Sequence, residues 1–103
     1  MGHSIAKLAT HIVFSTKRRE PWLECRESRG RLFGFMATIL ASNVDTPTIK
    51  INGVADHVHV LCLMSRKFPL MDILQEMKKE TSKWLKREIR EPDFCWQVGY
   101  GAF

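Results

Sequence analysis

The chain has 103 residues, the length of one domain, and its 45% hydrophobic and 26% charged residues exclude bulk disorder. Lysine and arginine outnumber aspartate and glutamate by 16 to 11, so the net charge is +5, which favours an anionic partner. No stretch is apolar enough to span a bilayer, and no apolar run follows a basic N-terminus. The three cysteines are odd in number and widely spaced. We therefore expect no membrane partner, no disulfide framework and a cytoplasmic location.

The first half of the chain predicts a helix between two strands. Apolar and polar residues alternate from Leu8 to Ser15, which predicts a strand, and Thr16 to Pro21 forms a basic loop. Apolar residues at helical spacing predict a helix over about 25–42. A second strand is predicted over 48–54.

The second half of the chain contains the strongest strand pattern and the clearest helix. A strand over 57–64 follows the second strand after a short connection, so the two form an antiparallel hairpin. An apolar stripe from Leu70 to Ile89 predicts a second helix, and Phe94 to Phe103 a last strand. The order strand, helix, strand, strand, helix, strand predicts an α+β fold of the ferredoxin-like split type. Such a fold has an antiparallel sheet with two helices on one face.

Two histidines on the third predicted strand carry the chemistry. His57 and His59 are two residues apart, so their imidazoles point to the same face of the strand. Imidazole binds most divalent transition ions, and the pair supplies half of a metal site. The plain alternative is two polar residues at the mouth of a hairpin. A zinc site that adds Cys62 and Cys95 is rejected, because alternation turns Cys62 to the opposite face.

Four stretches of the chain resemble one protein family, in the right order and over nearly the whole length. They are 11–19 (HIVFSTKRR), 56–61 (DHVHVL), 77–85 (MKKETSKWL) and 96–103 (WQVGYGAF). Together they resemble the HUH nucleases, in particular the single-tyrosine transposases of small bacterial insertion sequences and their REP-associated relatives. The fold of that family is the same split arrangement.

The resemblance implies a function and a mechanism. His57, His59 and a third polar ligand would hold Mg²⁺ or Mn²⁺, which polarises a scissile phosphate in single-stranded or hairpin DNA. A tyrosine would attack that phosphate and form a covalent 5′-phosphotyrosine. The resemblance further implies a homodimer, and DNA rather than a small molecule as the substrate.

The sequence departs from the family at its C-terminal end. The family carries its nucleophile and its third metal ligand on a further helix, and this chain stops at Phe103. Tyr100, the one tyrosine present, matches a strand tyrosine of the family, and its plain interpretation is a residue that packs on the sheet. We therefore expect residues 1–103 to be a single transposase-like domain, truncated before its catalytic helix and inactive alone, whose catalytic residue is unknown.

Basic and aromatic side chains in two loops are candidates for contacts to DNA. They are Lys17, Arg18, Arg19 and Trp22 in the first loop, and Arg66 and Lys67 in the second. Trp22 has an equally plausible role as a loop anchor. The lysines along the second helix are more simply a solvated face, and Trp84 and Trp96 are expected in the core.

Two questions stay open at this point. Leu61 and Leu63 continue the face of His57 and His59, and this face is uncovered only if both helices pack on the other one. The rival function is a non-catalytic nucleic-acid-binding module, either of the RNA-recognition type or a decayed transposase that binds hairpin DNA.

Overall fold

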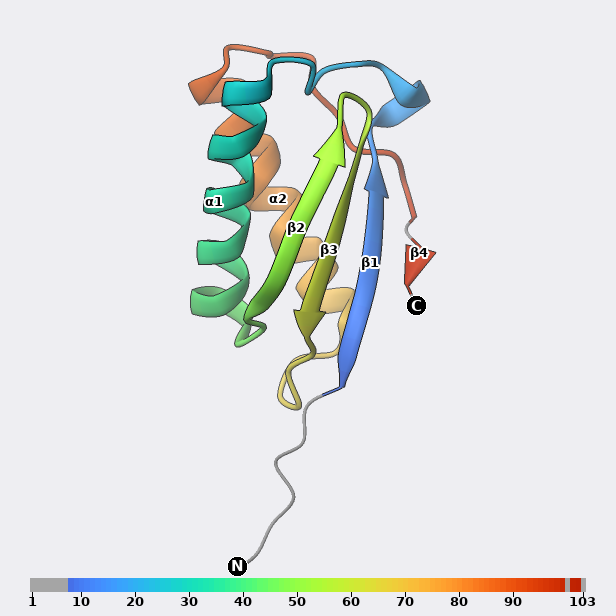
Figure 1. The fold of residues 1–103 in the computed structure, drawn as a ribbon, viewed down its shortest axis with the longest axis vertical. Coiled ribbons are helices and arrows are strands. Elements are labelled where there is room, and N and C mark those ends of the chain that lie inside the picture. The colour runs from blue at the N-terminus through green and yellow to red at the C-terminus, as the bar shows by residue number, and fades with distance from the viewer. Residues whose placement is uncertain (1–7, 100, 103) are drawn as a thin grey trace, which may run out of the picture.

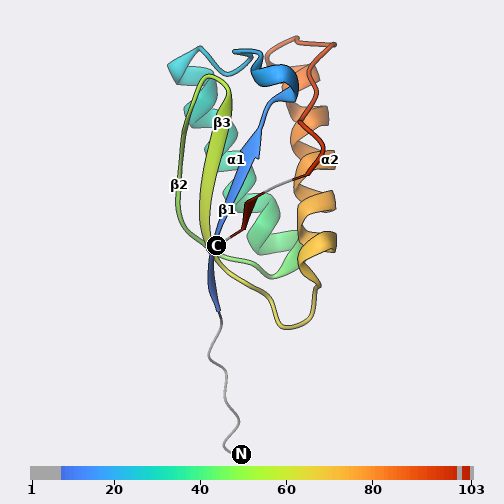
Figure 2. The same ribbon diagram turned by 90° about the vertical axis from the view of Figure 1, so that its right-hand side faces the viewer.

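The computed structural model describes residues 8–99 and 101–102. It contains a four-stranded antiparallel sheet with both helices on one side (Figures 1 and 2). The strand order is β2-β3-β1-β4. The elements are β1 (Ala9–Ser15), a short 3-10 helix η1 (Lys17–Arg19), α1 (Arg26–Val44), β2 (Thr48–Val54), β3 (His57–Leu63), α2 (Leu70–Glu88) and β4 (Gly101–Ala102). This confirms the predicted α+β fold with its split arrangement.

The hydrophobic core lies between the sheet and the two helices. Every second residue of the central strands is buried there, including Ile12 and Phe14 of β1 and Val58 and Val60 of β3. They join one cluster with side chains from both helices, among them Leu32, Met36, Leu40, Ile73, Met77 and Leu85. Burying such a side chain contributes about 1.5–3 kcal/mol, so the alternation decides which face of the sheet the helices cover. Among the described residues, no helix is long and apolar enough to cross a membrane.

The last strand is shorter than the pattern over 94–103 predicts. Regular pairing with β1 is confined to Gly101–Ala102, and one isolated bridge joins Trp96 to Thr16. The reason is local, because Gly99 has a φ of 93°, which takes the backbone out of the extended region. The segment before it is held by burial of aromatic side chains and not by a continuous ladder.

Side chains of α2 fix this C-terminal segment in place. The indole Nε1 of Trp96 donates a hydrogen bond to the buried Thr81 hydroxyl at 3.0 Å. Lys78 Nζ donates to the carbonyl oxygens of Gln97 and Gly99 at 2.9 and 2.8 Å. Burial lowers the pKa of Lys78. These hydrogen bonds hold the segment after α2 against the helix, on its way to the edge of the sheet at β1.

Gly53 allows the β2–β3 hairpin to close. It pairs with Val58, and a Cβ at this position would lie 2.5 Å from the carbonyl oxygen of His57. Such a contact is with backbone, so the strand that carries His57 would have to move. By contrast, a Cβ at Gly30 in α1 would meet nothing within 4 Å.

We predict opposite effects on stability for alanine at these two glycines. Gly53→Ala should lower the free energy of unfolding by about 1–3 kcal/mol through the backbone contact. Gly30→Ala is the matched control and should raise it by about 0.5–1 kcal/mol, because alanine loses less backbone entropy in a helix. Urea denaturation followed by circular dichroism measures both. Equal effects would contradict the close approach at Gly53.

Candidate functional site

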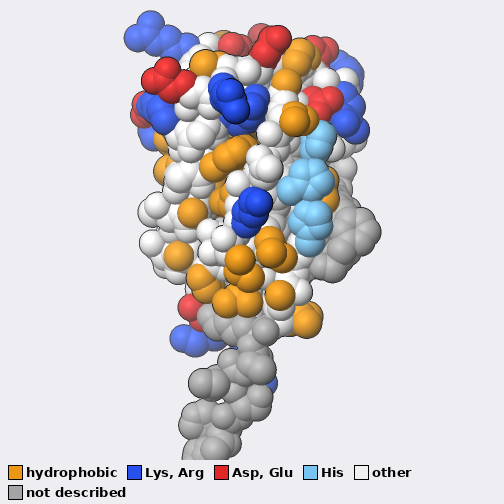
Figure 3. Space-filling model, in the orientation of Figure 1, with side chains coloured by type: hydrophobic (Ala, Val, Ile, Leu, Met, Phe, Trp, Pro, Cys, Tyr) orange, Lys and Arg blue, Asp and Glu red, His pale blue; other side chains and the backbone are white. Residues whose placement is uncertain are grey.

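Three histidines share the face of the sheet that the helices leave uncovered, here called the open face. His57 and His59 alternate along β3 with Val58 and Val60, which are buried under the helices. His11 comes from the neighbouring strand β1, where it alternates with Ile12 in the same way. Figure 3 shows the histidines as one column on this face, with hydrophobic side chains gathered below them. The structure thus answers the question of which face is uncovered, since Leu61 and Leu63 lie on the same face as the histidines.

His57 is held by a chain of polar contacts that ends at the basic turn. Its Nδ1 lies 2.8 Å from Oδ1 of Asp56, and Oδ2 of the same carboxylate accepts a bond from Nε of Arg19 at 3.1 Å. These bonds, from His57 first and then from Arg19, hold the pKa of the Asp56 carboxyl below its usual range. An ionised carboxylate accepts but cannot donate, so His57 carries a proton on Nδ1, and in the neutral tautomer with this proton the lone pair is on Nε2.

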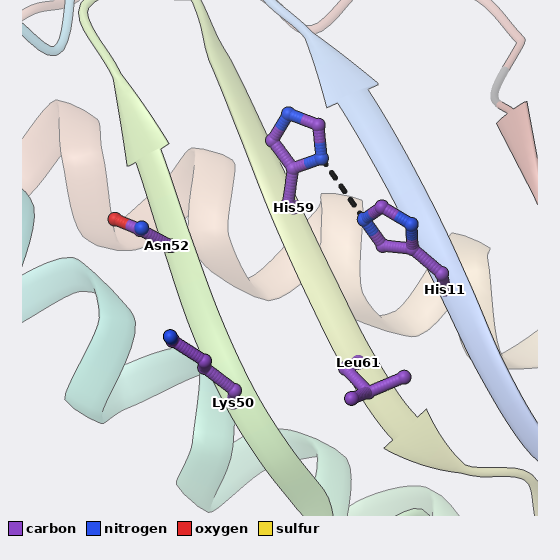
Figure 4. A pocket seen from close by; sticks show the side chains of 5 residues that line it. All are labelled: His11, Lys50, Asn52, His59 and Leu61. Carbon is purple, nitrogen blue, oxygen red and sulfur yellow. Dashed lines mark hydrogen bonds between the residues drawn. The ribbon is translucent and has the colours of Figure 1, made fainter.

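His59 contacts His11 across the two central strands. His11 Nε2 and His59 Nδ1 are 2.9 Å apart, and the two rings stack with centroids 5.0 Å apart at an angle of 27° (Figure 4). Burial, and secondarily the charges of His57 and His11, lower the pKa of His59. His59 is therefore neutral at neutral pH, which is the form of imidazole that binds a metal ion. Sequence reasoning assigned no role to His11, because alternation gives the face of a residue but not the register between strands.

The potential metal ligands on the open face are histidine nitrogens, and they are too few to complete a metal site. Among residues 8–99 and 101–102, no three His, Cys, Asp or Glu side chains converge to hold a metal ion. Cys62 lies on the buried face, where its thiol contacts the carbonyl oxygen of Thr10, and burial raises the pKa of this thiol to about 11. Cys62 therefore cannot complete a tetrahedral zinc site with His57 and His59, as alternation predicted.

An open hollow lies beside His59, between its ring and the side chains of β2. It has a volume of about 260 Å³ and is lined by His11, Lys50, Asn52, His59 and Leu61 (Figure 4). The Asn52 side-chain oxygen accepts a bond from the amide of Gly53, which leaves its NH₂ group available as a donor. Lys50 and Asn52, the residues of β2 that line this hollow, can each donate a hydrogen bond from the side chain.

The basic turn packs at the same end of the sheet as His57. Thr16 is fully buried, and its hydroxyl donates to the Glu20 carbonyl while its amide donates to that of Asp56. This ties the turn to the β2–β3 connection. A second open hollow, of about 340 Å³, is lined by Lys17, Arg18, Glu20, Trp22, Asp93 and Cys95. Basic and aromatic groups therefore meet here, although two carboxylates share the hollow.

The two predicted DNA contacts of the second loop are not brought to this place. Arg66 and Lys67 follow β3 at the opposite end of the sheet, as the pairing of Leu63 with Ala9 and the view in Figure 1 show. Trp22 is half-buried, and its ring meets that of Phe94 edge-on at 6.3 Å.

Two further expectations concern the helix face and the other tryptophans. Trp84 and Trp96 are buried in the core, as predicted. Lys79 pairs with Glu76 at 3.0 Å, and Lys83 lies 3.7 Å from Glu80, as expected of a solvated and partly neutralised helix face.

Comparison with known proteins identifies the family. Residues 4–103 match the sequence profile of the family described as transposase IS200 like. The chain belongs to this family. Comparison with curated proteins gives no match.

Two solved structures have the same fold as this IS200-like chain. One is a candidate transposase from Deinococcus radiodurans R1, with a TM-score of 0.84 and 19% identity over 100% of this chain and 83% of that one. The other is a REP-associated tyrosine transposase bound to a REP hairpin, with a TM-score of 0.67 and 10% identity over 100% of this chain and 59% of that one. At these identities the likeness concerns the fold. Both matches agree with the family resemblance seen in the sequence.

The contacts described above do not include a tyrosine, which the family resemblance makes part of the expected site. Tyr100, the one tyrosine of the sequence, lies outside the described residues. Among the described residues, the candidate site of this IS200-like chain therefore comprises His57 and His59 with their partners Asp56 and His11.

Proposed function

We propose that this chain is a DNA-binding transposase domain whose open face binds single-stranded or hairpin DNA next to a divalent cation. The observation that carries the proposal is the pair His57 and His59, neighbours on the open face, each with its Nδ1 already engaged by another side chain. The REP hairpin bound by one structural relative supports a hairpin as the DNA partner. We further propose that the protein works in the cytoplasm.

The cation we propose is Mg²⁺ or Mn²⁺, held through Nε2 of His57 and of His59. When bound, it would supply Lewis-acid polarisation of the scissile phosphate. The donor set fits in kind, because neutral imidazole binds divalent transition ions and because outer partners orient both rings. With two protein ligands among the described residues, water or the DNA would fill the remaining positions, so the binding should be weak. Imidazole ligands favour Mn²⁺ over Mg²⁺ as the experimental probe.

We predict that Mn²⁺ binds the chain weakly and only through this pair. Isothermal calorimetry with Mn²⁺ should show binding that disappears in the double variant His57→Ala, His59→Ala, because no other group of ligands is assembled among the described residues. The matched control exchanges a polar pair elsewhere, Asn43→Ala with Glu76→Ala, which are hydrogen-bonded between the two helices. The control should bind Mn²⁺ as the original chain does. Equal binding by the histidine variant would overturn the assignment.

The DNA surface we propose starts at the basic turn and continues over the open face. Lys17 and Arg18 lie at the end of the sheet that carries His57, beside the half-buried ring of Trp22. Lysine and arginine displace the counterions condensed on phosphates, so affinity should fall steeply with salt. The central strands present histidine and leucine on the open face, where an RNA-recognition module would present aromatic side chains. This composition favours the transposase over that rival.

We predict that the chain binds a DNA hairpin more tightly than a blunt duplex, and that the basic turn is responsible. The double variant Lys17→Glu, Arg18→Glu should weaken binding and reduce the slope of log affinity against log salt by about 1 for each phosphate that the turn no longer neutralises. The control Lys83→Glu, Lys86→Glu changes the net charge by the same amount on the exposed face of α2. Fluorescence anisotropy at several salt concentrations measures both. If the two variants lose affinity equally, net charge alone explains the binding and the proposed surface is wrong.

We propose a homodimer in which the apolar part of the open face is buried. Leu61 and Leu63 of β3 lie there, and Val13 of β1 lies on the same face, and the helices do not cover them. Contiguous apolar surface of this kind usually marks a contact site. Light scattering that gives the mass of a single chain at high concentration would contradict this assembly.

We propose, finally, that strand cleavage uses a tyrosine that this chain does not contain. The one tyrosine, Tyr100, lies outside the described residues and matches a strand tyrosine of the family, not its nucleophile. A nucleophile must come within reach of the phosphate before its pKa matters. Incubation with Mn²⁺ and a hairpin substrate should therefore give no covalent protein–DNA adduct on a denaturing gel.

The control for this prediction is a chain extended by a family-like helix that carries a tyrosine and a polar ligand four residues later. This extended chain should form the adduct under the same conditions. An adduct formed by the original chain and abolished by Tyr100→Phe would show that Tyr100 is the nucleophile and that our proposal is wrong.

A further inference from the structure

His11 makes a specific contact that neither the sequence motifs nor the family match assigns to it. In the β1–β3 ladder its Cα lies opposite Leu61, not His59. Its ring nevertheless reaches diagonally to His59, with Nε2 2.9 Å from Nδ1 and the rings stacked (Figure 4). Diagonal neighbours in an antiparallel pair are within reach of long and aromatic side chains. The contact thus depends on the register of the two central strands.

The chemistry of two imidazoles allows this contact in two ways, with opposite consequences for a metal ion. One ring must donate its N–H and the other must accept. If His59 donates through Nδ1, its Nε2 keeps a lone pair and can bind a cation. If His11 donates through Nε2, His59 is protonated at its own Nε2 and cannot bind a cation there.

The contact of His57 with Asp56 is the model for the arrangement that His59 would need in order to bind a cation. The Asp56 carboxylate accepts from Nδ1 of His57 at 2.8 Å, so Nε2 of His57 holds the lone pair. A histidine that ligates a metal usually donates its other N–H to an outer partner, which fixes both its tautomer and the orientation of the ring. His11 occupies for His59 the place that Asp56 occupies for His57.

We propose that His11 is a positioning residue, which accepts a hydrogen bond from Nδ1 of His59 and thereby holds Nε2 of His59 ready for a divalent cation. This inference rests on the proposed metal site of His57 and His59. His11 does not itself ligate the cation in this arrangement, because its Nε2 is directed at His59. The two outer partners come from different elements, Asp56 from the hairpin turn and His11 from β1.

The first test reads the tautomer in the unmodified protein. Long-range ¹H–¹⁵N correlation spectra distinguish a ring protonated at Nδ1 from one protonated at Nε2. We expect His59 to be protonated at Nδ1, both in metal-free protein and with saturating Mg²⁺. Protonation at Nε2 in both states would overturn the proposal. This measurement needs no substitution at His11, so it stands even if a variant fails to fold.

The second test measures Mn²⁺ affinity by calorimetry in two variants. His11→Phe keeps an aromatic ring against His59 but removes the acceptor, and it should weaken binding by about 10- to 100-fold. His11→Gln supplies an amide oxygen as the acceptor and should restore most of that affinity. The double variant Asn43→Ala, Glu76→Ala is the control, since this hydrogen-bonded pair joins the two helices, away from the open face. It should leave the affinity unchanged.

The outcomes separate this inference from the proposed site. If binding needs His57 and His59 but His11→Phe binds Mn²⁺ as tightly as the original chain, the positioning role is wrong and the metal site stands. If the original chain binds no Mn²⁺, the proposed site fails and the inference with it. If the glutamine variant binds as poorly as the phenylalanine variant, ring packing and not the hydrogen bond is responsible, and the proposal is overturned.

Discussion

The two unequal faces of β3 are the constraint from which the candidate site follows. Val58, Val60 and Cys62 are completely buried beneath α1 and α2, and moving the strand by one residue would exchange its faces. Because each buried apolar side chain contributes about 1.5–3 kcal/mol, such a shift is strongly disfavoured. His57 and His59 are therefore held on the open face by the residues between them. The core and the candidate metal site are specified by the same seven-residue strand.

A fixed strand places two histidines, but the neighbouring elements decide what those histidines can do. Asp56 directly precedes His57 in the turn of the hairpin and contacts its ring, and the same hairpin approaches closely at Gly53, where a side chain would strike the His57 carbonyl. His11 meets His59 because β1 pairs with β3 in one register. Each imidazole is thus oriented by a residue outside its own strand. Preorganisation of this kind lowers the cost of arranging ligands when a cation binds.

The elements with strong periodicity could be predicted from the sequence, and the contacts between elements could not. Alternation along β3 and the apolar stripe of α2 each reflect one element facing one core, so both are visible in a single sequence. The contact of His11 with His59 and the salt bridge of Arg19 with Asp56 depend on register and on loop conformation. The prediction of a long last strand was wrong for a local reason, because the φ of 93° at Gly99 interrupts a pattern that otherwise alternates.

The basic turn shows how loop conformation can separate residues that look equivalent in sequence. Arg18 and Arg19 both have a φ of 58°, a left-handed conformation that costs of order 1–3 kcal/mol for a residue other than glycine. The surrounding bonds from Thr16 to Asp56 and from Lys17 to Cys95 hold the turn in this shape.

One consequence of this shape is a division of roles between the two arginines. The Arg19 guanidinium is directed at Asp56, which in turn binds His57, whereas Arg18 lines the hollow beside Trp22. A phosphate that drew Arg19 away would remove one of the two side-chain bonds that hold the Asp56 carboxylate. Lys17 and Arg18 can contact phosphate without that loss. The two arginines of the basic turn are therefore not interchangeable, since Arg19 supports His57 through Asp56 and Arg18 lines the hollow beside Trp22.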